Sequence, residues 1–106
     1  MAGSILRHAV MLGFKDGTTQ AEIDELVRRF HALQNEVPGI EAFEWGVNNS
    51  PEGLANGLTH FFLLDFATEA ARDTYLPHPN HTAFAEWTGQ YVESVTVLDY
   101  WSKATP

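Results

Sequence analysis

The sequence predicts a single α+β domain in which helices cover one face of a four-stranded antiparallel sheet. Segments with strand and helix periodicity follow one another in the order strand–helix–strand–strand–helix–strand. This order is the split βαβ pattern, which is typical of ferredoxin-like folds. The chain has 106 residues, a length that suits one domain with one main core, so residues 1–106 are taken as that domain.

The first half of the chain is predicted to form a strand, a helix and a second strand. Residues 4–14 are an apolar run that ends at an Asp-Gly turn signal. Thr19 and Glu22 have the spacing of a capping box, and apolar residues then recur every three or four positions as far as Val37. A Pro-Gly pair ends this helix, and residues 40–48 alternate as the second strand.

The second half is predicted to contain a loop, two strands and a helical region that is divided in two. Residues 49–57 are polar and rich in glycine and proline, and residues 58–67 form the third strand. Residues 68–76 and 80–91 have helical spacing, with prolines between them that disfavour helix at each preceding residue. Residues 92–101 form the fourth strand.

Both faces of the predicted sheet carry apolar residues. In the third strand, one face holds His60, Phe62, Leu64 and Phe66, and the other holds Phe61, Leu63 and Asp65. Helices can cover only one face, and a face in contact with water normally alternates more cleanly with polar residues. Packing against the same face of a second copy would bury it with two-fold symmetry. We therefore expect a homodimer formed through the sheet face, and the alternative is an apolar face left exposed to solvent.

The charge and composition argue against several classes of protein. The formal net charge is -8, from 14 acidic and 6 basic residues, so a nucleic-acid partner is not expected. The absence of cysteine excludes disulfides and cysteine nucleophiles. No apolar run is long enough to span a membrane, and residues 1–11 lack the features of a signal peptide. We expect a cytoplasmic protein with no membrane partner.

The segment between the two predicted C-terminal helical regions contains the best candidates for catalysis. Tyr75, His78 and His81 lie close together in a stretch that two prolines stiffen. Histidine exchanges a proton near neutral pH, and a nearby tyrosine can hold a substrate oxygen. The alternative for His78 is a loop or capping role, and the alternative for His81 is a contact with the backbone.

Three further polar residues lie in predicted strands among apolar neighbours. His8 and His60 would form a shared polar site if their strands bring them together, and otherwise each is a satisfied core histidine. Asp99 needs a partner because a buried carboxylate is costly without one, and a histidine or a backbone donor would serve. The histidines show no zinc-site spacing, so no metal site is predicted.

A series of short motifs resembles the stress-responsive A/B barrel (Dabb) domain family. In family order they are His8-Ala9-Val10, Phe14-Lys15-Asp16-Gly17, Pro38-Gly39-Ile40, Trp45-Gly46, Thr59-His60, Tyr75-Leu76-Pro77-His78-Pro79-x-His81 and Asp99-Tyr100. The motifs cover nearly the whole chain. The resemblance implies a dimeric α/β barrel, in which two ferredoxin-like subunits join their sheets.

The resemblance also implies roles for individual residues. One type of characterised member is a cofactor-independent polyketide cyclase, whose tyrosine and histidine near the second helix perform an aldol cyclisation. These roles fall on Tyr75 and His81, and a pocket-lining histidine of the first strand falls on His8. The implied apolar wall consists of Val10, Leu12, Leu26, Phe30, Phe62, Leu64, Phe84, Val95 and Val97. Leu26 and Phe30 stand where the cyclase has bulkier or hydroxylated aromatics, so the pocket and its substrate should differ.

Together these observations predict a homodimeric A/B barrel domain with an apolar His/Tyr pocket for a small apolar or aromatic metabolite. The pocket is expected to include His60, His78 and Asp99 beside the residues above, and to need no cofactor. Its specific activity is left unassigned. The alternative is a cofactor-independent, polyketide cyclase-like lyase in which His81 is the acid/base and Tyr75 assists. Haem handling is a weaker alternative.

Overall fold

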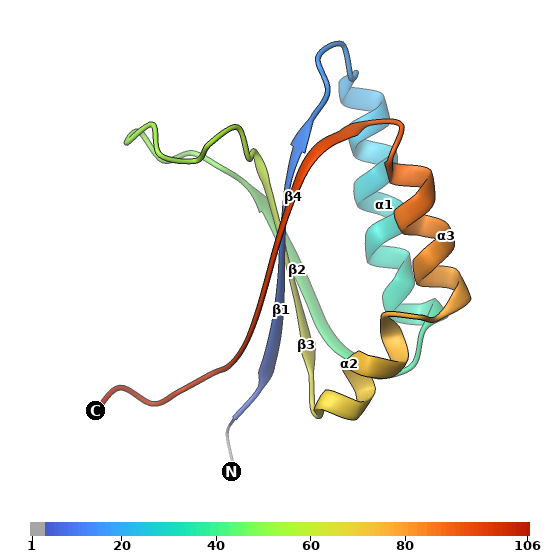
Figure 1. Cartoon of the computed structure of the whole chain (residues 1–106), viewed down its shortest axis with the longest axis vertical. Helices are drawn as coiled ribbons and strands as arrows, with labels where there is room; N and C mark the ends of the chain where they lie inside the picture. The colour runs from blue at the N-terminus through green and yellow to red at the C-terminus, as the bar shows by residue number, and fades with distance from the viewer. Residues whose placement is uncertain (1–3) are drawn as a thin grey trace.

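The computed structural model describes residues 4–106 and confirms the predicted order of elements (Figure 1). The elements are β1 (Leu6–Phe14), α1 (Gln20–Glu36), β2 (Ile40–Val47), β3 (His60–Phe66), α2 (Glu69–Tyr75), α3 (Pro79–Thr88) and β4 (Val92–Trp101). Most bounds differ from the predictions by one to three residues, and β4 matches its prediction. No helix of the described residues combines the length and the apolar character needed to cross a membrane.

Local capping interactions explain where the helices begin. Thr19 and Glu22 form the predicted capping box at the start of α1, with the Thr19 side chain accepting from the Glu22 backbone N–H. Thr68 caps α2 by accepting from the Ala71 N–H. His78 caps α3, where Pro79 occupies the first turn, a position that needs no backbone N–H donor.

The strands form one antiparallel sheet in the order β2-β3-β1-β4. In the register of this sheet, His8 of β1 pairs with Leu64 of β3 on one side and with Asp99 of β4 on the other. Directly paired residues share a face of the sheet. All three side chains therefore point to the same side.

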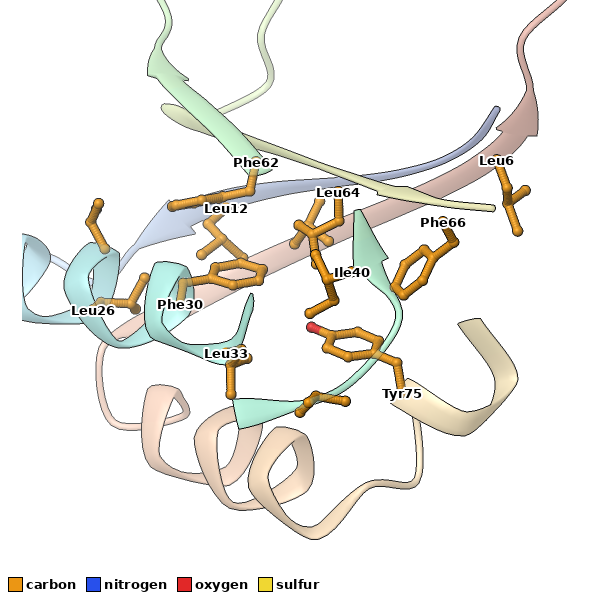
Figure 2. Packing of buried hydrophobic residues seen from close by; sticks show 13 residues of the cluster. Leu6, Leu12, Leu26, Phe30, Leu33, Ile40, Phe62, Leu64, Phe66 and Tyr75 are labelled. Atoms are coloured by element: carbon orange, nitrogen blue, oxygen red, sulfur yellow. The ribbon is translucent and has the colours of Figure 1, made fainter. Parts of the chain in front are cut away.

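The main core lies between the helices and the sheet (Figure 2). The helices all lie on one face of the sheet, as Figure 1 shows. Phe30 of α1 stacks on Phe62 of β3, with ring centroids 4.6 Å apart, and also contacts Phe84 of α3 at 5.0 Å. These aromatic contacts join both long helices to the centre of the sheet.

The other face of the sheet has no covering element in residues 4–106. Leu98 and Tyr100 of β4 are 61% and 50% exposed there, and Phe61 of β3 is 42% exposed. Arg7 and Asp65 form an ion pair on the same face, 2.7 Å apart. We call this surface the helix-free face. Figure 1 shows that loop 48–59 and the C-terminal tail both extend to its side of the sheet.

Candidate functional site

Tyr75 is the last residue of α2, and its side chain is fully buried. Figure 2 shows its ring in the core near Phe66, Ile40 and Leu33. Its hydroxyl group is buried and has no hydrogen-bond partner among the described residues. A buried polar group without a partner costs about 1–3 kcal/mol, so this hydroxyl is a feature that core packing alone does not explain.

His81 lies in the first turn of α3, and its ring centroid is 4.3 Å from that of Tyr75. Its Nδ1 is 2.8 Å from the backbone oxygen of Leu76. Because a carbonyl oxygen only accepts, Nδ1 carries the proton and donates, which leaves the lone pair of the neutral ring on Nε2. The backbone contact considered as an alternative for His81 is therefore present, and it orients the ring.

The environment of His81 favours the neutral form of its ring. Burial lowers the pKa of His81, and the nearby His8 and His78 lower it further, while the hydrogen bond to Leu76 opposes these effects. At neutral pH the ring is therefore uncharged, with Nε2 able to accept a proton.

His8 approaches the same place from β1 and is almost completely buried. Its Nδ1 is 2.7 Å from Oδ1 of Asp99, and its ring meets that of Tyr75 edge-on at 5.9 Å. The Asp99 carboxylate accepts from Nδ1–H, so Nε2 of a neutral His8 also carries a lone pair. This confirms the expectation that Asp99 pairs with a histidine. The register explains it, because His8 and Asp99 are direct partners in the sheet.

The tyrosine and the histidines have different chemical capacities. Burial raises the pKa of Tyr75 well above its ordinary value, so its phenol stays protonated and acts as a hydrogen-bond donor. His81 is the uncharged base beside it. A donor and a base on one small site can stabilise a carbonyl oxygen and move a proton next to it.

The structure places His60 away from this cluster. His60 pairs with Leu12, four positions along β1 from His8, which is about 13 Å at the rise of a strand. Its Nδ1 bonds with Thr59 Oγ1 at 2.8 Å, and its ring meets Phe14. Burial lowers the pKa of His60. The two strand histidines therefore do not form a shared site, because the antiparallel register separates them.

His78 serves as a helix cap, the alternative that its place between two prolines suggested. Its Nδ1 accepts a hydrogen bond from the Asn80 backbone N–H at 3.1 Å. This bond satisfies one of the free N–H groups at the start of α3. His78 therefore acts on the cluster indirectly, by fixing the helix that carries His81.

The expected apolar wall divides into a packed part and an open part. The packed part is the core itself, in which exposure is 0–8%: Val10, Leu12, Leu26, Phe30, Phe62 and Leu64. Phe84 is half-buried against Phe30. Val95 and Val97 lie on the helix-facing side of the sheet but are 56% and 49% exposed, because β4 is an edge strand. The open flank of the site is therefore at β4.

Two surface cavities lie outside this cluster. One, of about 510 Å³, lies beneath loop 48–59 and includes His60 in its lining. The other, of about 400 Å³, lies between α1 and α3 and includes Phe84. Neither is lined by Tyr75, His8 or His81. Within residues 4–106 no three potential ligand side chains gather as a metal site.

Arg72 was not among the residues selected from the sequence. Its Nη1 lies 3.3 Å from Oδ2 of Asp99, and its Nε bonds with Asp73 at 3.0 Å. Arg72 precedes Tyr75 by three positions on α2, a spacing that places two side chains on the same side of a helix. That spacing is the signal that could have identified it.

Comparison with known protein families and relatives agrees with the fold. The family model described as Stress responsive A/B Barrel Domain matches residues 6–102. Stress-response A/B barrel domain-containing protein HS1 of Arabidopsis thaliana is 35% identical over 95 residues, covering 90% of this chain and 87% of that protein. Olivetolic acid cyclase of Cannabis sativa is 26% identical over 95 residues, with coverage of 90% and 94%.

Solved structures of similar proteins superpose over nearly the whole chain. The hydroxynitrile lyase from Passiflora edulis has a TM-score of 0.88 and 29% identity, with 95% of each chain covered. A dimeric ferredoxin-like protein of unknown function from Jannaschia sp. has a TM-score of 0.78 and 27% identity, with 91% of this chain and 97% of that chain covered. The ferredoxin-like fold is thereby confirmed.

Proposed function

This chain belongs to the stress-responsive A/B barrel domain family, and we propose that it is a homodimer with a small-molecule site in each subunit. In this proposal the site is formed by Tyr75, His81 and His8, and it carries out cofactor-independent acid/base chemistry on a small carbonyl compound. The ligand is apolar or aromatic, because the core around these residues is apolar.

The observation that carries this proposal is the buried Tyr75 hydroxyl without a partner. A phenylalanine would fill nearly the same space without the cost of an unpaired hydroxyl. A ligand oxygen that accepts from this hydroxyl would remove that cost. The rings of His81 and His8, at 4.3 Å and 5.9 Å from the Tyr75 ring, would then border the same ligand.

The chemistry follows from the protonation states of these groups. His81 Nε2 takes a proton from the carbon next to a carbonyl, and the C–H electron pair becomes the enolate. Tyr75 donates a hydrogen bond to the developing enolate oxygen. In a cyclisation, the enolate carbon attacks a second carbonyl of the same molecule, and the protonated His81 supplies the proton to the new alkoxide.

Two relatives support a carbonyl substrate. Olivetolic acid cyclase is similar in sequence and is named for a cyclisation, and the hydroxynitrile lyase from Passiflora edulis is similar in structure and is named for hydroxynitriles, which are adducts of carbonyl compounds with cyanide. The identities of 26% and 29% leave room for a different substrate.

The proposed homodimer is supported by the helix-free face. Its exposed apolar side chains come from β4 (Leu98 and Tyr100) and from β3 (Phe61), the two strands that flank β1, and exposed apolar surface of this kind marks an interface. The similar protein from Jannaschia sp. is described as dimeric. Face-to-face packing of two such sheets buries Leu98, Tyr100 and Phe61 in both copies.

Entry of a ligand requires the site to open. Leu26, Phe62 and Leu64 are fully buried, so the site is closed by its own side chains. Helix α3 contributes no fully buried residue, and Val97 on edge strand β4 is half exposed. In the proposed function, the α2–α3 segment moves away from β4 when a ligand enters.

A second candidate function is ligand binding, or a stress role, without chemistry. The close packing of the core favours this second function, because side chains that fill the site leave no space for a substrate. In that case the histidines are structural, and His81 only ties α3 to Leu76.

Turnover by site variants separates the two candidates. The probe is 2-heptanone, followed by deuterium exchange next to the carbonyl. We expect activity in the wild-type protein, and its loss in His81→Ala and Tyr75→Phe while circular dichroism and dimer mass stay unchanged. Activity that persists in His81→Ala would exclude His81 as the base. The exposed His31→Ala is the matched control on α1.

A further inference from the structure

We propose that Arg72 is a positioning residue of this site, which acts through Asp99 to hold His8 in a single tautomer. The inference rests on the proposed function, because it assigns Nε2 of His8 to the ligand. It adds a residue that the motifs of the sequence did not indicate.

The geometry links two elements through one carboxylate. Oδ1 of Asp99 is 2.7 Å from Nδ1 of His8, and Oδ2 is 3.3 Å from Nη1 of Arg72. One carboxylate oxygen is thus bound by His8 of β1, and the other by Arg72 of α2. The guanidinium is itself held by Asp73, whose Oδ1 is 3.0 Å from Nε.

Asp99 needs this second anchor because of its place in the sheet. It lies on edge strand β4, where its neighbour Val97 on the same face is half exposed. The Asp99 side chain itself is 23% exposed, so its carboxylate borders solvent on one side and its hydrogen bonds decide its orientation. Glu69, another charged group of α2, bonds with Trp101 Nε1 at 3.1 Å and so does not compete for Arg72. Arg72 is the cation that restrains Asp99.

The tautomer of His8 depends on that restraint. A carboxylate fixed beside Nδ1 accepts a hydrogen bond from Nδ1–H, which keeps the proton on Nδ1 and the lone pair on Nε2. If the carboxylate swings away, the neutral ring is free to carry its proton on either nitrogen. Nε2 of His8 would then be a donor in part of the molecules and an acceptor in the rest. Arg72 also lies one helical turn before Tyr75, so the same ion pair holds α2 against β4.

The tautomer can be measured without any substrate. Long-range ¹H–¹⁵N NMR spectra would be recorded above the ordinary titration range of histidine, with the His8 signals assigned from His8→Gln. We expect one tautomer in the wild-type protein, protonated at Nδ1, and a mixture of both in Arg72→Met. Arg72→Lys, which keeps the charge, should restore most of the single tautomer. Arg28→Met, which removes an exposed ion pair with Glu25 on α1, is the matched control and should match the wild type.

A single tautomer in folded Arg72→Met would overturn the proposal, as would a mixture in the wild-type protein. If Arg72→Met does not fold, Arg72→Lys and Asp99→Asn decide the question in the same spectra. With an active substrate, kcat of Arg72→Met should fall at least tenfold with KM changed less than twofold. An inactive wild-type protein would count against the proposed function, and the tautomer would still decide the role of Arg72.

Discussion

The rings of Tyr75 and His81 lie 4.3 Å apart, one at the end of α2 and the other in the first turn of α3. The chain between them turns at Pro77-His78-Pro79, where the prolines prevent one continuous helix. The cap that His78 makes on Asn80 fixes the start of α3. A local break in a helix thus brings a phenol and an imidazole together above the sheet.

Replacing Tyr75 with phenylalanine should not destabilise the protein. The hydroxyl is buried without a partner, so its removal should leave the free energy of unfolding unchanged or raise it by up to about 2 kcal/mol. Urea denaturation of both proteins measures this difference. A loss of more than about 1 kcal/mol would mean that the hydroxyl makes a stabilising bond in the folded protein.

His81 should titrate below the ordinary range of histidine, because burial and the neighbouring His8 and His78 lower its pKa. The unfolded chain then binds a proton at a higher pH than the folded chain does. The contribution of His81 to stability is therefore present above about pH 6.5 and is lost as the pH falls through the lowered pKa. The Cε1–H signal of His81 reports this titration in NMR spectra.

The control for the pH dependence is a variant in which His81 cannot titrate. In His81→Gln the free energy of unfolding should fall less steeply than in the wild-type protein when the pH is lowered from 7.5 to 5. The pKa of His60 is lowered too, by burial, so some of the slope should remain. An identical slope in both proteins would contradict the lowered pKa of His81.

Leu26 tests whether the apolar wall is packed core. It is fully buried between α1 and the sheet, so Leu26→Ala should lower the free energy of unfolding by about 2–5 kcal/mol. Leu54→Ala, in the exposed loop, is the control and should change it by less than about 0.5 kcal/mol. A loss of less than about 1 kcal/mol at Leu26 would indicate an open, solvated pocket.

Adjacent residues of β4 test the proposed dimer. Leu98 lies on the helix-free face and Val97 on the opposite side of the same strand, and both are about half exposed or more. Leu98→Glu places a charge in the proposed interface and should yield a monomer, because a buried unpaired charge is costly. Val97→Glu should remain a dimer. Sedimentation equilibrium gives both masses, and a dimeric Leu98→Glu would place the interface elsewhere.

Much of the fold could be predicted because its signals are local. The capping box of Thr19 and Glu22, the prolines around His78 and the alternation of β3 each depend on a few neighbouring residues. These patterns determine the order and the approximate bounds of the elements. They also identified the two apolar faces of the sheet.

The candidate site was less predictable because it depends on register and packing. His60 and His8 lie apart because of the register in which β1 pairs with β3, and this register cannot be read from a single sequence. The bond between Arg72 and Asp99 joins residues 27 positions apart through the tertiary structure. Whether the apolar wall encloses a cavity or is filled depends on how closely side chains such as Phe30 and Phe62 pack against each other, which a sequence does not show.

The most direct test of the central claim is a high-resolution crystal structure of the protein soaked with acetophenone, a small aryl ketone. The proposed function predicts the ketone oxygen within hydrogen-bond distance of the Tyr75 hydroxyl, with its methyl carbon facing Nε2 of His81. A Tyr75 hydroxyl bonded to the backbone, with the ketone bound elsewhere or absent, would contradict the claim.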